Sequence, residues 1–436
     1  MRFAKLLICL ALSAGPLWAQ AAAPQAPVTL SLPAAIAMGR ERGVNAALAR
    51  LNERVAEARV GQHRADLLPS VGVSAGAGRQ TLNLDEFGLP FVHGVTDPFT
   101  VWRFQAHASE TLFDASIITR YRAARDSALA SGADSRAVGE LTAAAAGLAY
   151  LRALSAAETV RAREADSAVA ASLLDQANQM VTAGVNPAID GTRSEVQLAS
   201  VLTRLEVARN QHDRALLDLA RTLDLPPETP LVLTDSLGAA DASIPRDPAD
   251  AVSFALAHRP EVEAEHARTQ VVERSLRAIG LEYVPNLSIG GYYQQSGTSL
   301  SGLAGSWLAQ FQVSIPLLDG FRRPARQQEQ SARLEAQRLR EHDVERQVAT
   351  EARQALLDLS SADHQVTLAT DQLHLAEREL DQARDRFAAG VAGSVETTNA
   401  EGELVAARDG LIQARVNAAV ARVSALRALG VLDQIQ

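Results

Sequence analysis

The chain has 436 residues, of which 47% are hydrophobic and only 4% aromatic, so it is long enough for two or three domains and is not disordered by composition. Its formal net charge of −9 argues against a nucleic-acid partner. The only cysteine is Cys9, near the N-terminus, so neither a disulfide nor a reactive thiol is expected in the rest of the chain.

Residues 1–21 are expected to be a secretory signal peptide. The basic side chains of Arg2 and Lys5 precede a short apolar run, and small residues surround the expected cleavage site after Ala21. The run is too short to span a hydrocarbon core of about 30 Å, and no later stretch has the roughly 20 apolar residues that a spanning helix needs. A lipid anchor at Cys9 is disfavoured because no small residue directly precedes it. If the chain crosses a membrane, strands must therefore do so.

The rest of the chain is a tandem duplication. The sequence "LPSVGV" is matched by "VPNLSI" 216 positions later, and "WRFQAHASETLFD", from Trp102, is matched by "WLAQFQVSIPLLD", from Trp307, 205 positions later. Ala-Gly-Val occurs around Gly184 and again around Gly390, 206 positions apart. A fixed separation between matching segments indicates a structural repeat. The matches predict two repeats, at residues 22–245 and 246–436.

Each repeat is predicted to contain the same elements in the same order. A helix with proline near its start comes first, followed by two strands joined by a loop, a long helix, a turn at a tip, and a shorter helix. The shorter helices have about half the length of the long ones, so two half-length helices can stack end to end beside each long helix. The first helices are expected at residues 33–67 and 248–283, the long helices at 114–183 and 324–387, and the shorter helices at 187–225 and 395–429.

The second long helix carries a regular seven-residue repeat. Apolar side chains recur every seven residues, and alanine recurs every seven residues at the alternate core position. This pattern favours a coiled-coil seam, where alanine lets the neighbouring helix approach closely, over a buried helix of a globular bundle. Charged side chains along the coils are expected to line solvated faces. The apolar positions are Leu359, Val366, Leu373, Leu380 and Phe387, and the alanine positions are Ala362, Ala369, Ala376 and Ala383.

The segments that begin at Trp102 and Trp307 alternate between apolar and polar residues. Trp102 and Phe104 share one face of the first segment, and Trp307 and Phe311 share one face of the second. Such segments, about ten residues long with aromatic residues near an end, are typical of transmembrane β-barrel strands, which would put these four aromatic side chains at the membrane interface. Soluble hairpins on a core are the alternative. Four strands cannot close a barrel, so three chains with twelve strands are predicted.

These features resemble the TolC-like outer-membrane efflux protein family. The resemblance rests on the duplicated plan, on "LSLPAAIAMGRERG" and "DPADAVSFALAHRPEV" near the starts of the repeats, and on "VSIPLLDGFRR". It implies a fold that is mainly α with β, in which a long α-helical coiled-coil barrel continues a transmembrane β-barrel. Each chain of a homotrimer would give four strands to a twelve-stranded barrel in outer-membrane lipid. The implied function is the exit duct of a drug-efflux pump or a type I secretion system, a passive conduit without enzymatic activity or a cofactor.

By the same resemblance, the two tips are the periplasmic ends of the molecule. There, members of the family meet a periplasmic adaptor, or membrane-fusion protein, that couples them to an inner-membrane pump of the RND, ABC or MFS type. The tip contact motif of the family falls on Gly184, Val185, Gly390 and Val391, and here alanine precedes each glycine. Two tips per chain would give six per trimer, a ring on which adaptors can dock.

The resemblance also implies a gate at the tips. Glu396 matches the first of two constriction carboxylates in the second repeat, and the second falls on Asn399, so one acidic ring is lost or weakened. Asp190 matches the first-repeat acid of a polar latch whose other members fall on Phe387 and Ala392, so that latch is not expected here. The alternative is that Asp190 and Glu396 only stabilise the N-terminal ends of their helices.

The chemistry of an enzyme is not apparent in the sequence. No nucleotide-binding loop, zinc-ligand spacing or cysteine nucleophile occurs, and the nine histidines are scattered singly, so no metal site is expected. The alternatives to a duct are a periplasmic coiled-coil adaptor and a structural stalk without a pore. The sequence leaves open the exported substrate and the class of the pump.

Overall fold

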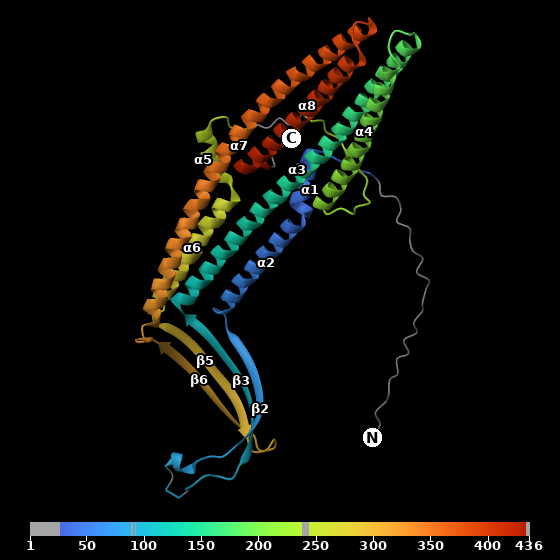
Figure 1. The fold of residues 1–436 in the computed structure, drawn as a ribbon. Coiled ribbons are helices and arrows are strands. Elements are labelled where there is room, and N and C mark those ends of the chain that lie inside the picture. Colours follow the sequence, from blue (N-terminus) through green and yellow to red (C-terminus); the bar gives the residue numbers. More distant parts are fainter. Residues whose placement is uncertain (1–26, 89, 92, 238–243, 433–436) are drawn as a thin grey trace, which may run out of the picture.

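The computed structural model describes residues 27–88, 90–91, 93–237 and 244–432, and the expected signal peptide lies outside these ranges. Two long helical hairpins end in tips at one end of the molecule, and a four-stranded antiparallel sheet lies at the other end (Figure 1). The predicted mainly helical fold with a sheet of four strands is confirmed. Among the residues described, no helix combines the length and hydropathy needed to cross a membrane.

The two repeats contain corresponding helices and strands, with a short additional strand at the start and end of the first. The first repeat consists of β1 (Val28–Leu30), α1 (Leu32–Arg42), α2 (Val44–Ala65), β2 (Ser70–Gln80), the 3-10 helix η1 (Leu84–Phe87), β3 (Phe99–Phe113), α3 (Ala115–Thr182), α4 (Ala188–Thr222) and β4 (Leu231–Leu233). The second consists of α5 (Pro248–His258), α6 (Pro260–Leu281), β5 (Asn286–Gly297), β6 (Ala304–Ser314), α7 (Arg322–Ala388) and α8 (Ser394–Leu429).

The first helix of each repeat is broken in two, so the prediction of one continuous helix is wrong. The breaks fall at Gly43, between α1 and α2, and at Arg259, between α5 and α6. Arg259 precedes Pro260, and a residue before proline is biased towards the extended conformation. Gly43 is also non-helical (φ −52°, ψ 131°), and an added Cβ there would meet the carbonyl oxygen of Gly39 at 2.6 Å. The breaks leave α1 and α5 as separate pieces that pack on α3 and α7.

The long helices and the coiled-coil seam are confirmed. The 68 residues of α3 and the 67 of α7 each extend about 100 Å at 1.5 Å per residue. Half-length helices pack along each of them: α4 and α2 along α3, and α8 and α6 along α7. In the second hairpin, Leu380 and Ala383 of α7 pack against Ala400 and Leu404 of α8. Alanine at alternate positions brings the two helices close, which makes each hairpin a tight apolar pair.

The largest hydrophobic core lies at mid-length, where the repeats meet. Tyr150 of α3 is completely buried there, and its hydroxyl lies 3.1 Å from the carbonyl oxygen of Leu30 and 3.0 Å from the carboxylate of Asp235. Burial, with the neighbouring Asp235 carboxylate, raises the pKa of Tyr150 to about 12, so the phenol keeps its proton. The contact ties β1, which pairs in parallel with β4, to the long helix.

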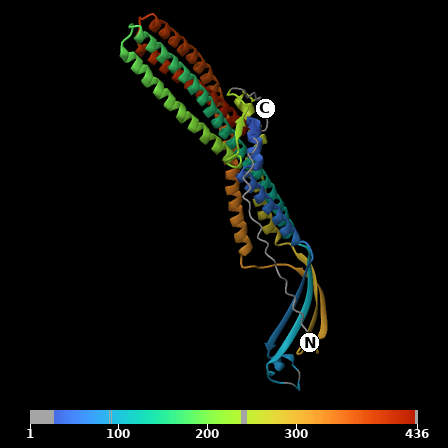
Figure 2. The ribbon, with the colours of Figure 1, turned by 90° about the vertical axis from the view of Figure 1, so that its right-hand side faces the viewer.

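The sheet has the strand order β2-β3-β5-β6, and every neighbouring pair is antiparallel. Its register brings the predicted alternating faces together across all four strands: Phe104 shares a face with Tyr293, which is opposite Trp307. β2 and β6 are the edges, each with one side unpaired within the described chain. The sheet curves away from the helices, and the two hairpins lean together at the other end (Figure 2). The mostly apolar face includes Val71, Val73, Trp102, Phe104, Ile289, Tyr293, Trp307, Phe311 and Val313.

Candidate functional site

The two tips have the same backbone geometry. After α3, Gly184 is left-handed (φ +72°), its N–H donates to the carbonyl oxygen of Val181 (3.0 Å), and the N–H of Val185 donates to that of Met180 (3.0 Å). These two bonds satisfy carbonyl groups that would otherwise be free at the helix end. After α7, Gly390 (φ +68°) and Val391 repeat both bonds. Glycine is therefore required at both tips for backbone conformation.

The exposed apolar side chain next to each tip glycine is the valine that follows it. Val185 and Val391 are both well exposed, and a Cβ added at Gly390 would lie 3.6 Å from Cγ1 of Val185. The tips of the two repeats therefore lie together at one end of the chain (Figure 1), and each exposes an apolar side chain there. This small apolar end is where the sequence predicted docking of an adaptor.

Replacing Gly390 with alanine is expected to lower the free energy of unfolding by about 1–2 kcal/mol, because a Cβ in the left-handed conformation crowds the following carbonyl oxygen. The nearest other atom would be at an ordinary contact distance, so the loss reports backbone strain. Gly410→Ala in α8 is the matched control: no atom lies within 4 Å, and alanine should stabilise the helix interior by about 0.5–1 kcal/mol. Thermal unfolding followed by circular dichroism checks both, and a loss of equal size at Gly410 contradicts the assignment.

The two tip acids have different surroundings, which the sequence did not distinguish. Asp190 is buried at the start of α4 and accepts a hydrogen bond from the hydroxyl of Ser394, at the start of α8 (2.7 Å). Glu396 is partly exposed and pairs with Arg386 of its own hairpin, with 2.8 Å between Oε1 and Nε. Asp190 therefore joins the two repeats, whereas Glu396 contacts only the second.

The remaining residues assigned to the gate also differ in exposure. Asn399 is exposed on α8, and Phe387, near the end of α7, is almost completely buried. Phe387 is thus part of the apolar seam of its hairpin, in line with its place in the seven-residue repeat. The contact between Ser394 and Asp190 provides a polar link at the tips, although Phe387 and Ala392 occupy the other positions of the expected latch. Ser394 was not predicted; a hydroxyl at the first residue of a helix was its only signal.

Further along the hairpins, charged side chains are buried between α3 and α8. Arg163 of α3 pairs with Asp166 of the same helix (2.7 Å) and with Asp409 of α8, and Asp166 also pairs with Arg408 of α8 (2.6 Å). The prediction that charges along the coils line solvated faces is wrong for Arg163 and Asp166, which are both buried. We call the polar side chains at the contact between the hairpins the polar seam: Asp190, Ser394, Glu401, Arg163, Asp166, Arg408 and Asp409.

Glu401 is the least satisfied member of the polar seam. Its side chain is 1% exposed, and neither carboxylate oxygen meets hydrogen-bonding geometry with any residue that the structure describes. Burial raises the pKa of Glu401; the nearby Gln197 opposes the rise, and the charge of Asp166 adds to it. No sequence signal distinguishes this acid from the exposed Glu403 two residues later. The described residues contain no group of three or more His, Cys, Asp or Glu side chains that could hold a metal ion.

Comparison with known proteins gives a consistent result. The family described as "Outer membrane efflux protein" matches residues 39–224 and 251–431, which is most of both repeats. The protein CyaE of Bordetella pertussis (strain Tohama I) is 28% identical over 370 residues, covering 83% of this chain and 75% of its own. Among solved structures, the outer-membrane channel OprN superposes with a TM-score of 0.78 at 19% identity, covering 92% of this chain and 89% of the other. The Campylobacter jejuni outer membrane channel CmeC gives 0.79 at 16% identity, covering 92% and 86%.

Proposed function

Because this chain belongs to the outer membrane efflux protein family, we propose that three copies of it form a passive export duct across the outer membrane and the periplasm. The chain is an outer-membrane efflux protein and not an enzyme. Our proposal concerns its assembly, its partners and the roles of individual residues. Each chain would contribute two repeats to the duct, residues 22–245 and 246–436, and the duct would need no cofactor.

The observation that carries the proposal is the open four-stranded sheet with one mostly apolar face. Strand directions alternate across the sheet, so β6 of one chain and β2 of the next are correctly oriented for antiparallel pairing. Lipid tolerates no unpaired strand edge, and closure by three chains gives twelve strands and no free edge. The 11 residues of β6 span about 35 Å, or roughly 25 Å when tilted by about 45°, which is the height of the apolar band of such barrels.

In this assembly, the apolar face of the sheet meets lipid and its polar face lines the pore. Trp102, Phe104 and Trp307 lie towards the loop end of the sheet, and Phe311 lies closer to the helices. We assign these four side chains to contacts with outer-membrane lipid, the first three near the outer interface. The polar residues that alternate with them, such as Gln105 and Gln312, would face water in the pore.

The hairpins continue the pore towards the periplasm and end at the docking surface. We propose that Gly184, Val185, Gly390 and Val391 receive the helical hairpin of a periplasmic adaptor, with six tips per trimer. The exposed valines support this assignment because a small apolar end is otherwise unfavourable in water. The adaptor would connect the duct to an inner-membrane pump of the RND, ABC or MFS type, which supplies all the energy.

At the same end, Glu396 is our candidate for the carboxylate ring that narrows the pore and prefers cations. Asp190 would help to hold the closed state through Ser394, with Phe387 as the apolar support of the tip and Asn399 one turn beyond Glu396. The partial exposure of Glu396 and the burial of Asp190 support these different roles.

The test is conduction by purified trimers in a planar lipid film. We expect ion conduction with a preference for cations, and Glu396→Gln should weaken the preference without abolishing conduction, because a ring of negative charge attracts cations. Glu206→Gln removes a more exposed acid that is also paired with an arginine but lies far from the tip, and it is the control. Unchanged selectivity in the Glu396 variant refutes only that residue's role. A monomer that conducts no ions refutes the duct and favours an adaptor or stalk.

A further inference from the structure

The polar face of the sheet carries positive charge and no acid. Its residues are mostly Ser, Gly and Gln, and Arg103 and His107 are the only Arg, Lys, His, Asp or Glu residues among them. The one acid of the sheet strands, Glu110, is on the other face, opposite Ile289. A pore lined by the polar face would therefore have a fixed positive charge in its wall.

Arg103 is exposed, and its guanidinium forms no ion pair or side-chain hydrogen bond with the residues that the structure describes. Its cross-strand neighbours are Gly76 on β2 and Ser296 on β5. A Cβ added at Gly76 would meet nothing within 4 Å, so the surface beside Arg103 is open. His107 differs because its ring lies against Gly72, where an added Cβ would be 2.5 Å from Cε1. The charge of Arg103 is therefore available to a ligand.

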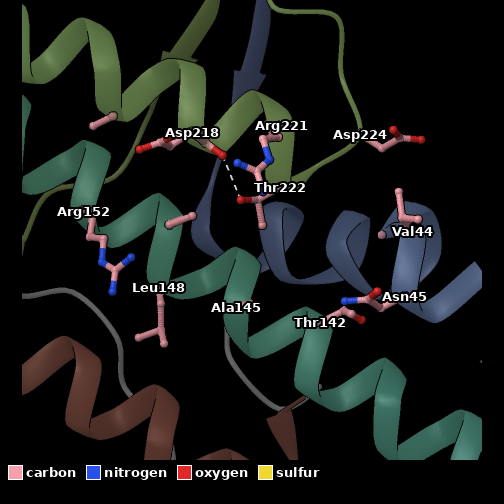
Figure 3. A pocket seen from close by; sticks show the side chains of 13 residues that line it. Val44, Asn45, Thr142, Ala145, Leu148, Arg152, Asp218, Arg221, Thr222 and Asp224 are labelled. Carbon is pink, nitrogen blue, oxygen red and sulfur yellow. Dashed lines mark hydrogen bonds between the residues drawn. The ribbon is translucent and has the colours of Figure 1, made fainter.

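Several arginines in other parts of the chain lie beside acids. At the junction of the sheet with the helices, Arg120 and Arg326 both pair with Glu282. A cavity of about 780 Å³ between the end of α4 and the start of α2 is lined by two arginines and two aspartates, so its charges cancel. These four residues are Arg152, Arg221, Asp218 and Asp224 (Figure 3). Arg103 has no such compensation on its face of the sheet.

The acids of the loop between β2 and β3 are too far away to neutralise Arg103. Asp85, Glu86 and Asp97 belong to this loop, which extends beyond the free end of the sheet (Figure 1). Arg103 lies four residues inside β3, which begins at Phe99, and this corresponds to about 13 Å along the strand. The Debye length is about 8 Å at physiological ionic strength, so the charges of the loop are largely screened at Arg103.

We propose that Arg103 forms an anion-binding ring in the β-barrel, with one guanidinium from each of three copies, and that this ring attracts cargo with carboxylate or phosphate groups. The inference rests on the proposed function, because only closure of the barrel places Arg103 around a pore. Rings of Arg or Lys are a common means by which pores favour anions. A guanidinium can bind either oxyanion through two parallel N–H donors.

The ring is far from the acids at the tips. Glu396 lies at the other end of the molecule, beyond helices that extend about 100 Å. An anionic compound that the pump moves past the tips is drawn towards the positive ring, and a cation that enters from outside is repelled by it. Arg103 therefore favours outward passage of anions, independently of the ion preference that Glu396 gives to the tips.

Block of the ion current by a compact polyanion tests the inference. Inositol hexakisphosphate is added on both sides of a planar lipid film that contains purified trimers, so that it reaches the barrel without having to pass the tips. We expect it to interrupt the current, and Arg103→Gln should raise the half-blocking concentration by about tenfold or more, because the positive ring is lost. Arg103→Lys keeps the charge and should retain most of the block. Uncharged inositol should not block.

Arg79→Gln is the matched control. Arg79 is an exposed arginine of the neighbouring strand β2, and it lies on the apolar face, two residues beyond Ala77, which is opposite Trp102. The substitution removes the same charge from the outer surface of the barrel instead of the pore. The half-blocking concentration should therefore stay at the wild-type value.

The outcomes separate this inference from the proposed function. A block that Arg103→Gln weakens and Arg79→Gln leaves unchanged supports the inference. Conducting trimers that the polyanion does not block, or whose block is unaffected by Arg103→Gln or equally weakened by Arg79→Gln, overturn the inference and leave the duct intact. A protein that conducts no ions overturns both.

Discussion

Replacing Arg163 with methionine is expected to lower the free energy of unfolding by about 3 kcal/mol, the low end for breaking a buried ion pair, because it removes one of the two arginines that pair with the buried carboxylate of Asp166. Asp166 is 1% exposed and is held by Arg163 from its own helix and by Arg408 from α8. Methionine keeps much of the length of the side chain, so the loss reports the charge rather than a cavity. Arg163 also pairs with Asp409, so the substitution removes a link between the hairpins as well.

The measurement is the midpoint of guanidinium-induced loss of helix in detergent, followed by circular dichroism. Arg161→Met is the matched control: Arg161 lies two residues away, is exposed, and pairs only with Glu158 on the same helix. It is expected to change stability by less than about 0.5 kcal/mol. Adding Asp166→Leu to Arg163→Met should restore part of the loss, since the buried carboxylate that has lost one of its two arginines is then gone. Equal midpoints for the Arg163 and Arg161 variants would show that the polar seam does not hold the hairpins together.

Replacing Glu401 with glutamine is expected to raise stability at neutral pH by about 1–3 kcal/mol, because burial disfavours the charged carboxylate and glutamine, of the same size, carries no charge. The folded-state pKa of Glu401 is raised by burial above its ordinary value of 4.5. Folding therefore favours the protonated carboxyl. In the wild-type protein, the protonated carboxyl stabilises the folded state at pH values below the ordinary pKa. This stabilisation is lost as the pH rises through the raised pKa. Glutamine does not titrate, so the variant does not undergo this loss.

Unfolding midpoints of both proteins, compared between about pH 5 and pH 8, test this prediction. The difference between variant and wild type should grow as the pH rises. The charged groups around Glu401 are Asp166 of α3, Arg204 of α4 and Arg384 of α7, and all are retained in the variant. Glu403→Gln removes an exposed acid of the same helix and should leave the pH profile unchanged. If the difference in unfolding midpoint between Glu401→Gln and the wild type does not change with pH, folding does not change the pKa of the Glu401 carboxyl.

Much of the fold could be predicted because its signals are local and periodic. The seven-residue spacing that includes Leu380 and Phe387 identifies the core side of α7, whatever packs there. Alternation around Trp102 and Trp307 identifies the faces of the strands, and the cross-strand register preserves it. Gly184 and Gly390 mark the tips because only glycine adopts a left-handed conformation at little cost.

The candidate site was predicted only in part. Asp190 and Glu396 occupy matching positions after the two tip glycines, but one is buried against the other repeat and the other is paired at the surface. The two acids differ because Ser394, from the second hairpin, contacts Asp190 of the first. Arg163 and Glu401 resemble any charged residues on a solvated helix, and only the packing of the two hairpins shows that they are buried.

The sequence by itself determined the duplication, the order of the elements, the apolar side of each strand and of α7, and the positions of the tips. These features depend on spacing along one chain and on the conformational limits of single residues. Only the tertiary structure decided which charges are buried between the hairpins, and why Leu151 is covered while its duplicate Leu357 is bare. Burial depends on which helix lies alongside, and the duplicated sequences of the two repeats do not carry that information: α3 lies between the helices of both repeats, whereas α7 lies at the edge of the chain.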